Sequence, residues 1–124
     1  MFKLIITVTK KAEMPLNEFI QYYEEKHVPL LCKILPPIDD YKRNYIVPND
    51  PLTSNDTTNE KKENEQDFHV FTELGFLSRE KAESFLTAFF SPENHTIISE
   101  DEAKFVAPNG VKAYVVKVHQ TINA

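Results

Sequence analysis

Three segments of this 124-residue chain, residues 2–9, 68–76 and 111–119, have the two-residue hydrophobic period of β-strands. All three also carry apolar side chains on both faces. In the first, Leu4 and Ile6 alternate with Ile5. A strand that is apolar on both sides must be covered from both sides. The chain is therefore expected to form a sheet with neither face left in water.

Helical periodicity separates these strands. Residues 15–34 carry an apolar stripe that ends before Pro36-Pro37, and residues 78–89 carry a second one that follows Ser78, a good N-cap. Residues 41–47 alternate as a further strand. Ser91-Pro92 predicts a short helical turn, and Ser99 with Glu102 has the spacing of a capping box.

The predicted order is β-α-β-β-α-β, an α+β, ferredoxin-like arrangement with a four-stranded antiparallel sheet in one domain, residues 1–124. Two helices cover only one face of such a sheet. The other face would remain an exposed apolar patch, which monomers rarely carry. We therefore expect a homodimer that packs through its sheet faces.

Charge and composition exclude some kinds of partner and location. The net charge is −5, which argues against a nucleic-acid partner, and no apolar run is long enough to cross a membrane. The single cysteine, Cys32, fits a reducing, cytoplasmic location. Residues 49–67 are acidic and poor in aliphatic side chains, so we expect a mobile loop there.

His27 is the leading candidate for chemistry. Counting 100° per residue from Leu16 places it near the centre of the apolar stripe of the first helix. Pro29 cannot donate to the carbonyl of Glu25, so we expect the helix to kink or break at His27–Val28. An inward imidazole there can act as a general acid or base. The alternative is a core histidine with a purely structural hydrogen bond.

Other polar residues offer weaker candidates. Tyr23 lies on the same stripe, and its hydroxyl needs a partner if it is buried, either His27 or a ligand. His69 and Glu73 can form an acid–base pair on one strand face, or simply face solvent or the dimer partner. The histidines and Cys32 lack metal-site spacing, and we expect neither a metal nor another cofactor. Haem bound by His27 is a further alternative.

A set of residues spread along the chain resembles the EthD family of the dimeric α/β-barrel superfamily, in which two ferredoxin-like chains pack sheet to sheet. The residues that carry this resemblance are Phe19, Tyr22-Tyr23, His27, Pro29-Leu30, Ser91-Pro92-Glu93, Asp101 and Phe105. The resemblance covers the chain apart from the acidic loop. It implies a pocket between the sheet and the helices of each subunit, and His27 matches the family's characteristic histidine.

The resulting expectation is a small, cofactor-independent EthD-like enzyme. Its substrate would be a hydrophobic or aromatic, carbonyl-bearing molecule, and its reaction of the decarboxylase, dehydratase or monooxygenase type. His27 would transfer the proton with help from Tyr23, and the expected ligand contacts are Tyr22, Asn44, Phe71, Phe85 and Phe89. The alternative is a non-catalytic dimer that binds a hydrophobic ligand or serves as an accessory subunit.

Overall fold

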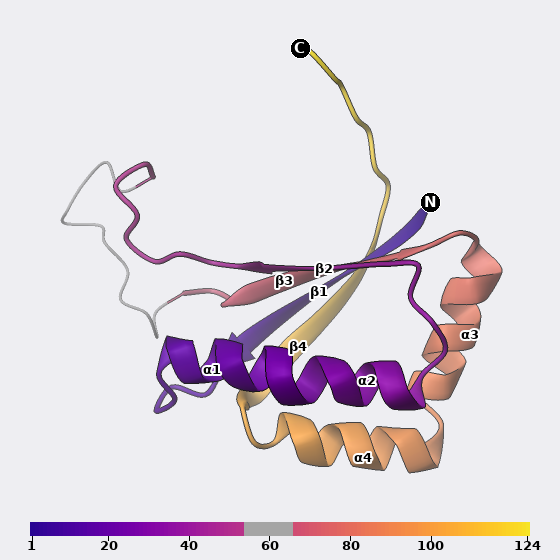
Figure 1. Ribbon diagram of the computed structural model, residues 1–124, viewed down its shortest axis with the longest axis horizontal. Coiled ribbons are helices and arrows are strands. Elements are labelled where there is room, and N and C mark those ends of the chain that lie inside the picture. Colours follow the sequence, from indigo (N-terminus) through magenta and orange to yellow (C-terminus); the bar gives the residue numbers. More distant parts are fainter. Residues whose placement is uncertain (54–65) are drawn as a thin grey trace.

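The computed structural model describes residues 1–53 and 66–124, and these form an antiparallel sheet with the helices on one face (Figure 1). The sheet order is β2-β3-β1-β4, with β1 (Phe2–Lys10), β2 (Asp40–Tyr45), β3 (Val70–Phe76) and β4 (Val106–Val116). The helical segments are α1 (Leu16–Tyr22), η1 (Tyr23–His27), α2 (Val28–Ile34), α3 (Arg79–Phe89) and α4 (Pro92–Glu102). The predicted ferredoxin-like order is confirmed.

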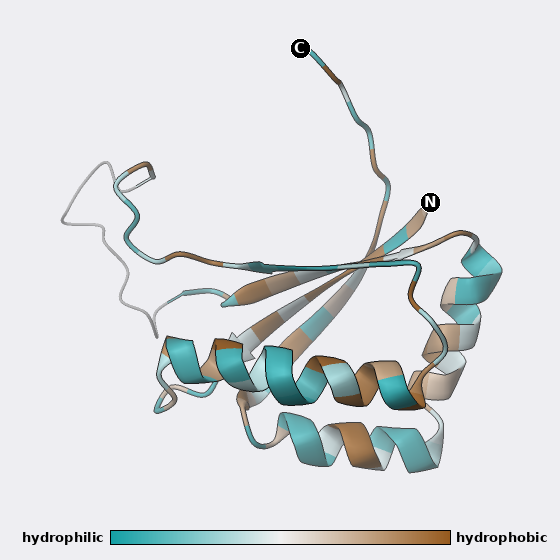
Figure 2. Ribbon diagram, in the orientation of Figure 1, coloured by the Kyte–Doolittle hydropathy of each residue, from teal (hydrophilic) through white to brown (hydrophobic). Residues whose placement is uncertain are grey.

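The register of β1 defines the two faces of the sheet. Residues directly opposite each other in an antiparallel pair share a face. Leu4 lies opposite Leu74, and both are buried beneath the helices. Ile5 lies opposite Glu73 on the other face, which the described helices leave open (Figure 1). β1 and β3 are largely apolar, whereas β2 at the sheet edge is largely hydrophilic (Figure 2).

β4, the other edge strand, is exposed even on its helix side. Val115 pairs with the buried Leu4 and so points to the helix side, yet 65% of its surface is exposed. Val111, which pairs with Val8, is 37% exposed. The apolar pattern of this strand therefore does not reflect burial within one chain.

A kink or break was expected at His27–Val28, but the helical stretch does not break there. Tyr23–His27 instead form a π-helical turn, in which the N–H of Val28 donates to the carbonyl of Tyr23. A proline has no N–H to donate, and the wider turn changes the hydrogen-bond register just before Pro29. The chain then continues as α2, so that α1, η1 and α2 form one continuous rod (Figure 1).

The second helical region is confirmed at its start and corrected at its end. The Ser78 hydroxyl accepts a hydrogen bond from the N–H of Lys81 at 3.2 Å and caps α3 as predicted. The short turn expected after Ser91-Pro92 is a full helix, α4, because proline suits a first helical turn and no breaker follows it. Ser99 therefore lies inside α4 and does not cap a new helix.

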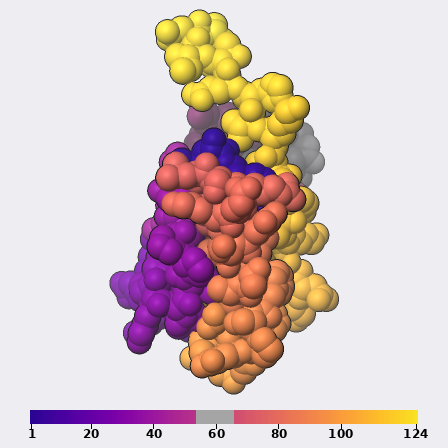
Figure 3. Space-filling view, turned by 90° about the vertical axis from the view of Figure 1, so that its right-hand side faces the viewer, coloured from indigo at the N-terminus to yellow at the C-terminus, as the bar shows by residue number. Residues whose placement is uncertain are grey.

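The remaining differences lie at element ends. β2 ends at Tyr45, two residues earlier than expected, and β4 runs from Val106 to Val116. Much of the acidic loop expected at residues 49–67 lies outside the described residues. Residues after β4 extend away from the body (Figures 1 and 3). Within the described part of the chain, the helices are too short or too polar to cross a membrane.

Candidate functional site

His27 ends the π-helical turn with its imidazole directed into the molecule. Its Nδ1 lies 2.9 Å from Oδ2 of Asp101, in the last turn of α4. The hydroxyl of Tyr22 donates to the other oxygen of the same carboxylate, Oδ1, at 2.6 Å. One carboxylate thus joins the first helical rod to the second helical region through two side chains.

Asp101 is the ionised member of this group. Burial raises the pKa of its carboxyl, but the hydrogen bonds from His27 and Tyr22 outweigh burial and hold that pKa below its usual value. Burial and the adjacent Asp101 carboxylate raise the pKa of Tyr22 to about 12, so this hydroxyl remains a donor at neutral pH. The ionised Asp101 accepts a hydrogen bond from the N–H at Nδ1 of His27. In a neutral imidazole the free lone pair is then on Nε2.

Aromatic rings enclose the imidazole. The ring centroid of Tyr23 lies 4.8 Å from that of His27, and the ring of Phe105 lies 5.0 Å away, both inclined at 60°. The His27 residue is only 5% exposed. Because water is largely excluded, electrostatic interactions at this imidazole are stronger than they would be at the surface.

Tyr23 contacts His27 through its ring and not through its hydroxyl. The hydroxyl forms its hydrogen bond with Oγ1 of Thr72 on β3, at 3.1 Å. Burial raises the pKa of Tyr23 to about 12. Of the two partners suggested for this hydroxyl, His27 or a ligand, His27 is excluded, because the tyrosine points across to the sheet while α4 supplies the carboxylate of Asp101.

The other expected ligand contacts do not gather around His27. Phe85 is buried against Phe76, with ring centroids 5.4 Å apart, and Phe89 packs beside the same core cluster. Asn44 and Phe71 pair across β2 and β3 on the open face of the sheet. The structure thus brings together His27, Tyr22 and Tyr23, and it distributes the four other candidates over two separate places.

His69 and Glu73 do not form an acid–base pair, and the alternative, that both face solvent or the dimer partner, fails for the buried His69. His69 is 1% exposed, and its Nδ1 accepts the backbone N–H of Lys10 at 3.1 Å. Glu73 instead accepts from Lys3 at 3.1 Å and from Asn44 at 3.0 Å. β3 begins only at Val70, so the strand alternation used to place His69 does not extend to it.

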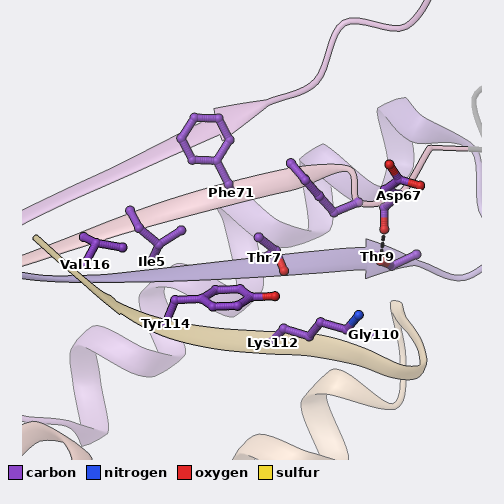
Figure 4. Close-up of a pocket in the computed structure, with 10 residues that line it drawn as sticks. Ile5, Thr7, Thr9, Asp67, Phe71, Gly110, Lys112, Tyr114 and Val116 are labelled. Carbon is purple, nitrogen blue, oxygen red and sulfur yellow. Dashed lines mark hydrogen bonds between the residues drawn. The ribbon is translucent and has the colours of Figure 1, made fainter.

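The open face of the sheet carries a hollow of about 580 Å³. Ile5, Phe71, Tyr114 and Val116 supply its apolar side chains, and Lys112 lies beside Tyr114 on β4 (Figure 4). This hollow and His27 lie on opposite sides of the sheet, so the hollow is not the pocket expected beside the imidazole.

Asp101 is the residue whose role the sequence did not reveal. It contributes to the family resemblance, but no local pattern connects it with His27, which lies 74 residues earlier. In residues 1–53 and 66–124, no three His, Cys, Asp or Glu side chains are grouped so as to hold a metal ion.

The fold and the buried histidine–carboxylate pair define a ferredoxin-like α+β domain whose distinctive polar group lies between its helices. Residues 11–109 match the EthD domain, which is four-fifths of the chain. The chain belongs to the EthD family. No curated protein matches its sequence.

Solved structures share the fold at low sequence identity. An ethyl tert-butyl ether (EthD) family protein from Bacillus halodurans superposes with a TM-score of 0.60 at 20% identity, covering 96% of this chain and all of the other. Arabidopsis thaliana At3g17210 gives 0.56 at 14% identity, covering 98% and 99%. HapK from Hahella chejuensis gives 0.53 at 10% identity, covering 100% and 99%.

Proposed function

We propose that this chain is a homodimeric EthD-family enzyme that acts without a cofactor on a hydrophobic or aromatic, carbonyl-bearing small molecule. The observation that carries the proposal is the 2.9 Å contact between His27 Nδ1 and the ionised Asp101. A histidine with one nitrogen held by a buried carboxylate is suited to proton transfer at the other nitrogen. Decarboxylation, dehydration and cofactor-free oxygenation near a carbonyl all include such a transfer.

In the proposed mechanism His27 accepts a proton at Nε2 from the carbon or oxygen next to the substrate carbonyl. The negative Asp101 stabilises the imidazolium that results, and Tyr22 keeps the carboxylate oriented. His27 then returns the proton to the product or to water. The enclosing rings of Tyr23 and Phe105 limit competition from solvent.

A generic ketone tests this step before the natural substrate is known. We expect the protein to accelerate exchange of the methyl protons of 2-acetylnaphthalene for deuterium in D₂O, followed by proton NMR. His27→Ala is expected to remove the acceleration, while circular dichroism shows a folded protein. Exchange at the rate of buffer alone, or equal exchange by His27→Ala, would contradict the proposal.

A non-catalytic, ligand-binding or accessory dimer is the second candidate, and the tight enclosure of His27 favours it. With 5% exposure, the imidazole can reach a substrate only if neighbouring side chains move. On this alternative His27→Ala lowers the melting temperature but leaves ligand affinity unchanged. On the enzyme proposal the same variant loses turnover.

The homodimer is proposed from the open face of the sheet. Ile5, Phe71, Tyr114 and Val116 form an apolar surface around the hollow there, and Tyr114 is 49% exposed. A second sheet packed about 10 Å away would remove this surface from water and enclose the hollow. Glu73 and Lys3, already paired at 3.1 Å, would enter the interface with their charges compensated.

A further inference from the structure

A second hollow lies between the end of α4 and the start of β4, on the helix side of the sheet. Its volume is about 470 Å³, within the range of small-molecule sites. Val106, Pro108 and Val111 give it apolar walls, and Lys11 and Glu102 supply its charged side chains. The proposed mechanism makes no use of this hollow.

The wall formed by β4 is shaped by a bulge. The pairing of β1 with β4 shifts between Val8 and Lys10, and Asn109 adopts a left-handed φ of 57°. A Cβ placed on Gly110 would lie 2.8 Å from the carbonyl oxygens of Ala107 and Thr9. Only glycine fits at this close approach, so the concave wall is a specific feature of the strand.

Glu102 differs from its neighbour Asp101 in how its carboxyl is satisfied. Asp101 receives hydrogen bonds from His27 and Tyr22. The backbone carbonyl of Glu102 accepts the N–H of Phe105, but the described parts of the chain, 1–53 and 66–124, supply no hydrogen-bond or ion-pair partner for its carboxyl. A partly buried carboxyl that borders a hollow and has no protein partner is available to a ligand.

The groups around Glu102 shift the pKa of its carboxyl in both directions. Burial raises its pKa above the usual value and the negative Asp101 raises it further, whereas His27 and His95 act to lower it whenever they carry a proton. Lys11 also lines the hollow. The net result is a raised pKa for Glu102 beside a lowered pKa for Asp101. Adjacent carboxyls with diverging pKa values are typical of a proton donor beside a charged group.

We propose that this hollow binds a small, largely apolar carbonyl compound, which the unpartnered Glu102 side chain orients by a hydrogen bond. The apolar walls take the body of the molecule, and the carboxyl orients its carbonyl. The choice of a carbonyl compound rests on the proposed function. The site itself rests on the hollow and on the unpartnered carboxyl.

The test is the affinity of 2-acetylnaphthalene, measured by NMR titration between pH 4.5 and 8.5. We expect shifts at the backbone amides of Val106 and Ala107, which line only this hollow, and an affinity that falls about tenfold as Glu102 ionises, the loss of one good hydrogen bond. Glu102→Gln keeps a donor at every pH, so its binding should stay strong across the range. Glu102→Leu should bind weakly throughout.

Glu100→Gln is the matched control, because Glu100 is an exposed carboxylate on the same helix. This variant should bind with the pH dependence of the unmodified protein. Three results would overturn the inference: no binding, shifts at Phe71 and Tyr114 on the open face instead, or an affinity of the unmodified protein that does not change with pH.

The enzymatic proposal and the proposed Glu102 site can be contradicted independently of each other. His27→Ala should retain binding of 2-acetylnaphthalene at pH 4.5 while it loses deuterium exchange. Binding without any exchange by the unmodified protein would contradict the enzymatic proposal alone. Exchange without binding at Val106 and Ala107 would contradict the Glu102 site alone.

Discussion

At the scale of single residues, the protonation pattern of His27 is decided by Asp101. One oxygen of the Asp101 carboxylate accepts a hydrogen bond from His27 Nδ1, and the other accepts one from the Tyr22 hydroxyl. The three side chains therefore act as one unit. In such hydrogen-bonded groups, removing the side chain that orients the histidine usually has a large effect on the histidine.

Replacing Asp101 with asparagine should therefore impair proton transfer without unfolding the protein. An amide can present its NH₂ to Nδ1, which favours the tautomer with the proton on Nε2, and it provides no charge to stabilise an imidazolium. We expect deuterium exchange to fall by roughly 10²-fold or more. Tyr22→Phe, which removes only the bond to Oδ1, should have a smaller effect. Equal activity of Asp101→Asn and the unmodified protein would show that Asp101 does not position His27.

The lowered pKa of Asp101 also predicts acid sensitivity. Its pKa is lower in the folded than in the unfolded chain, so the unfolded chain binds the proton more readily as the pH falls. The stabilisation is fully present above the unfolded value of about 3.9 and is lost as the pH drops through the lower folded value. Urea unfolding at pH 6 and at pH 3 should show a smaller loss of stability for Asp101→Asn than for the unmodified protein.

At the scale of elements, the π-helical turn is held to the sheet by a cluster of Glu24, Arg43 and Tyr45. Arg43 on β2 donates to both oxygens of Glu24, at 3.0 and 2.7 Å, and the Tyr45 hydroxyl donates to the same carboxylate at 2.5 Å. The hydrogen bond from Arg43 is the main cause that lowers the pKa of Glu24. This cluster orients the turn that carries His27.

A double-mutant cycle measures that connection. Glu24→Ala should lower the free energy of unfolding by about 1–2 kcal/mol, because Arg43 and the Tyr45 hydroxyl lose a shared acceptor. The coupling between Glu24→Ala and Arg43→Ala should be about 0.5–1 kcal/mol, since both side chains are partly exposed to solvent. Glu18→Ala, at an exposed position on α1, should change stability by less than about 0.5 kcal/mol. Additive effects of the two alanines would mean that the ion pair does not hold the turn.

At the scale of the whole molecule, the fold leaves one side of the sheet without helices, and β4 is exposed on both of its faces. The helix-side Val115 is 65% exposed and the opposite Tyr114 is 49% exposed. Neither exposure is explained by the helices of one chain, and the exposure of Tyr114, on the open face, is expected of a sheet that packs against a second subunit.

A lysine introduced on the open face of the sheet should change the oligomeric state. Phe71→Lys places a charge in the centre of the proposed interface, so it should convert the dimer to a monomer at micromolar concentration, as measured by light scattering. Phe90→Lys, at a 64% exposed phenylalanine after α3, should remain dimeric. A monomeric unmodified protein would remove the dimer from the proposed function.

Sequence periodicity was sufficient for the element order and for the inward direction of His27, because both follow from side-chain spacing along a single strand or helix. It failed where a local signal is overridden by the helix around it. A π-helical turn takes the place of the kink or break expected at His27–Val28, and Ser99 continues α4 instead of capping a new helix.

The contacts between elements were decided only by the tertiary structure. The sheet register places Asn44 and Phe71 on the face opposite His27, and the docking of α4 brings Asp101 to an imidazole 74 residues away. Periodicity predicts which face of its own helix or strand a side chain lies on. Hydrogen bonds between residues distant in sequence depend on how the helices and strands pack together. The chain's pattern of apolar residues therefore determined a two-sided sheet and a buried histidine, whereas the partner of that histidine is a property of the folded chain.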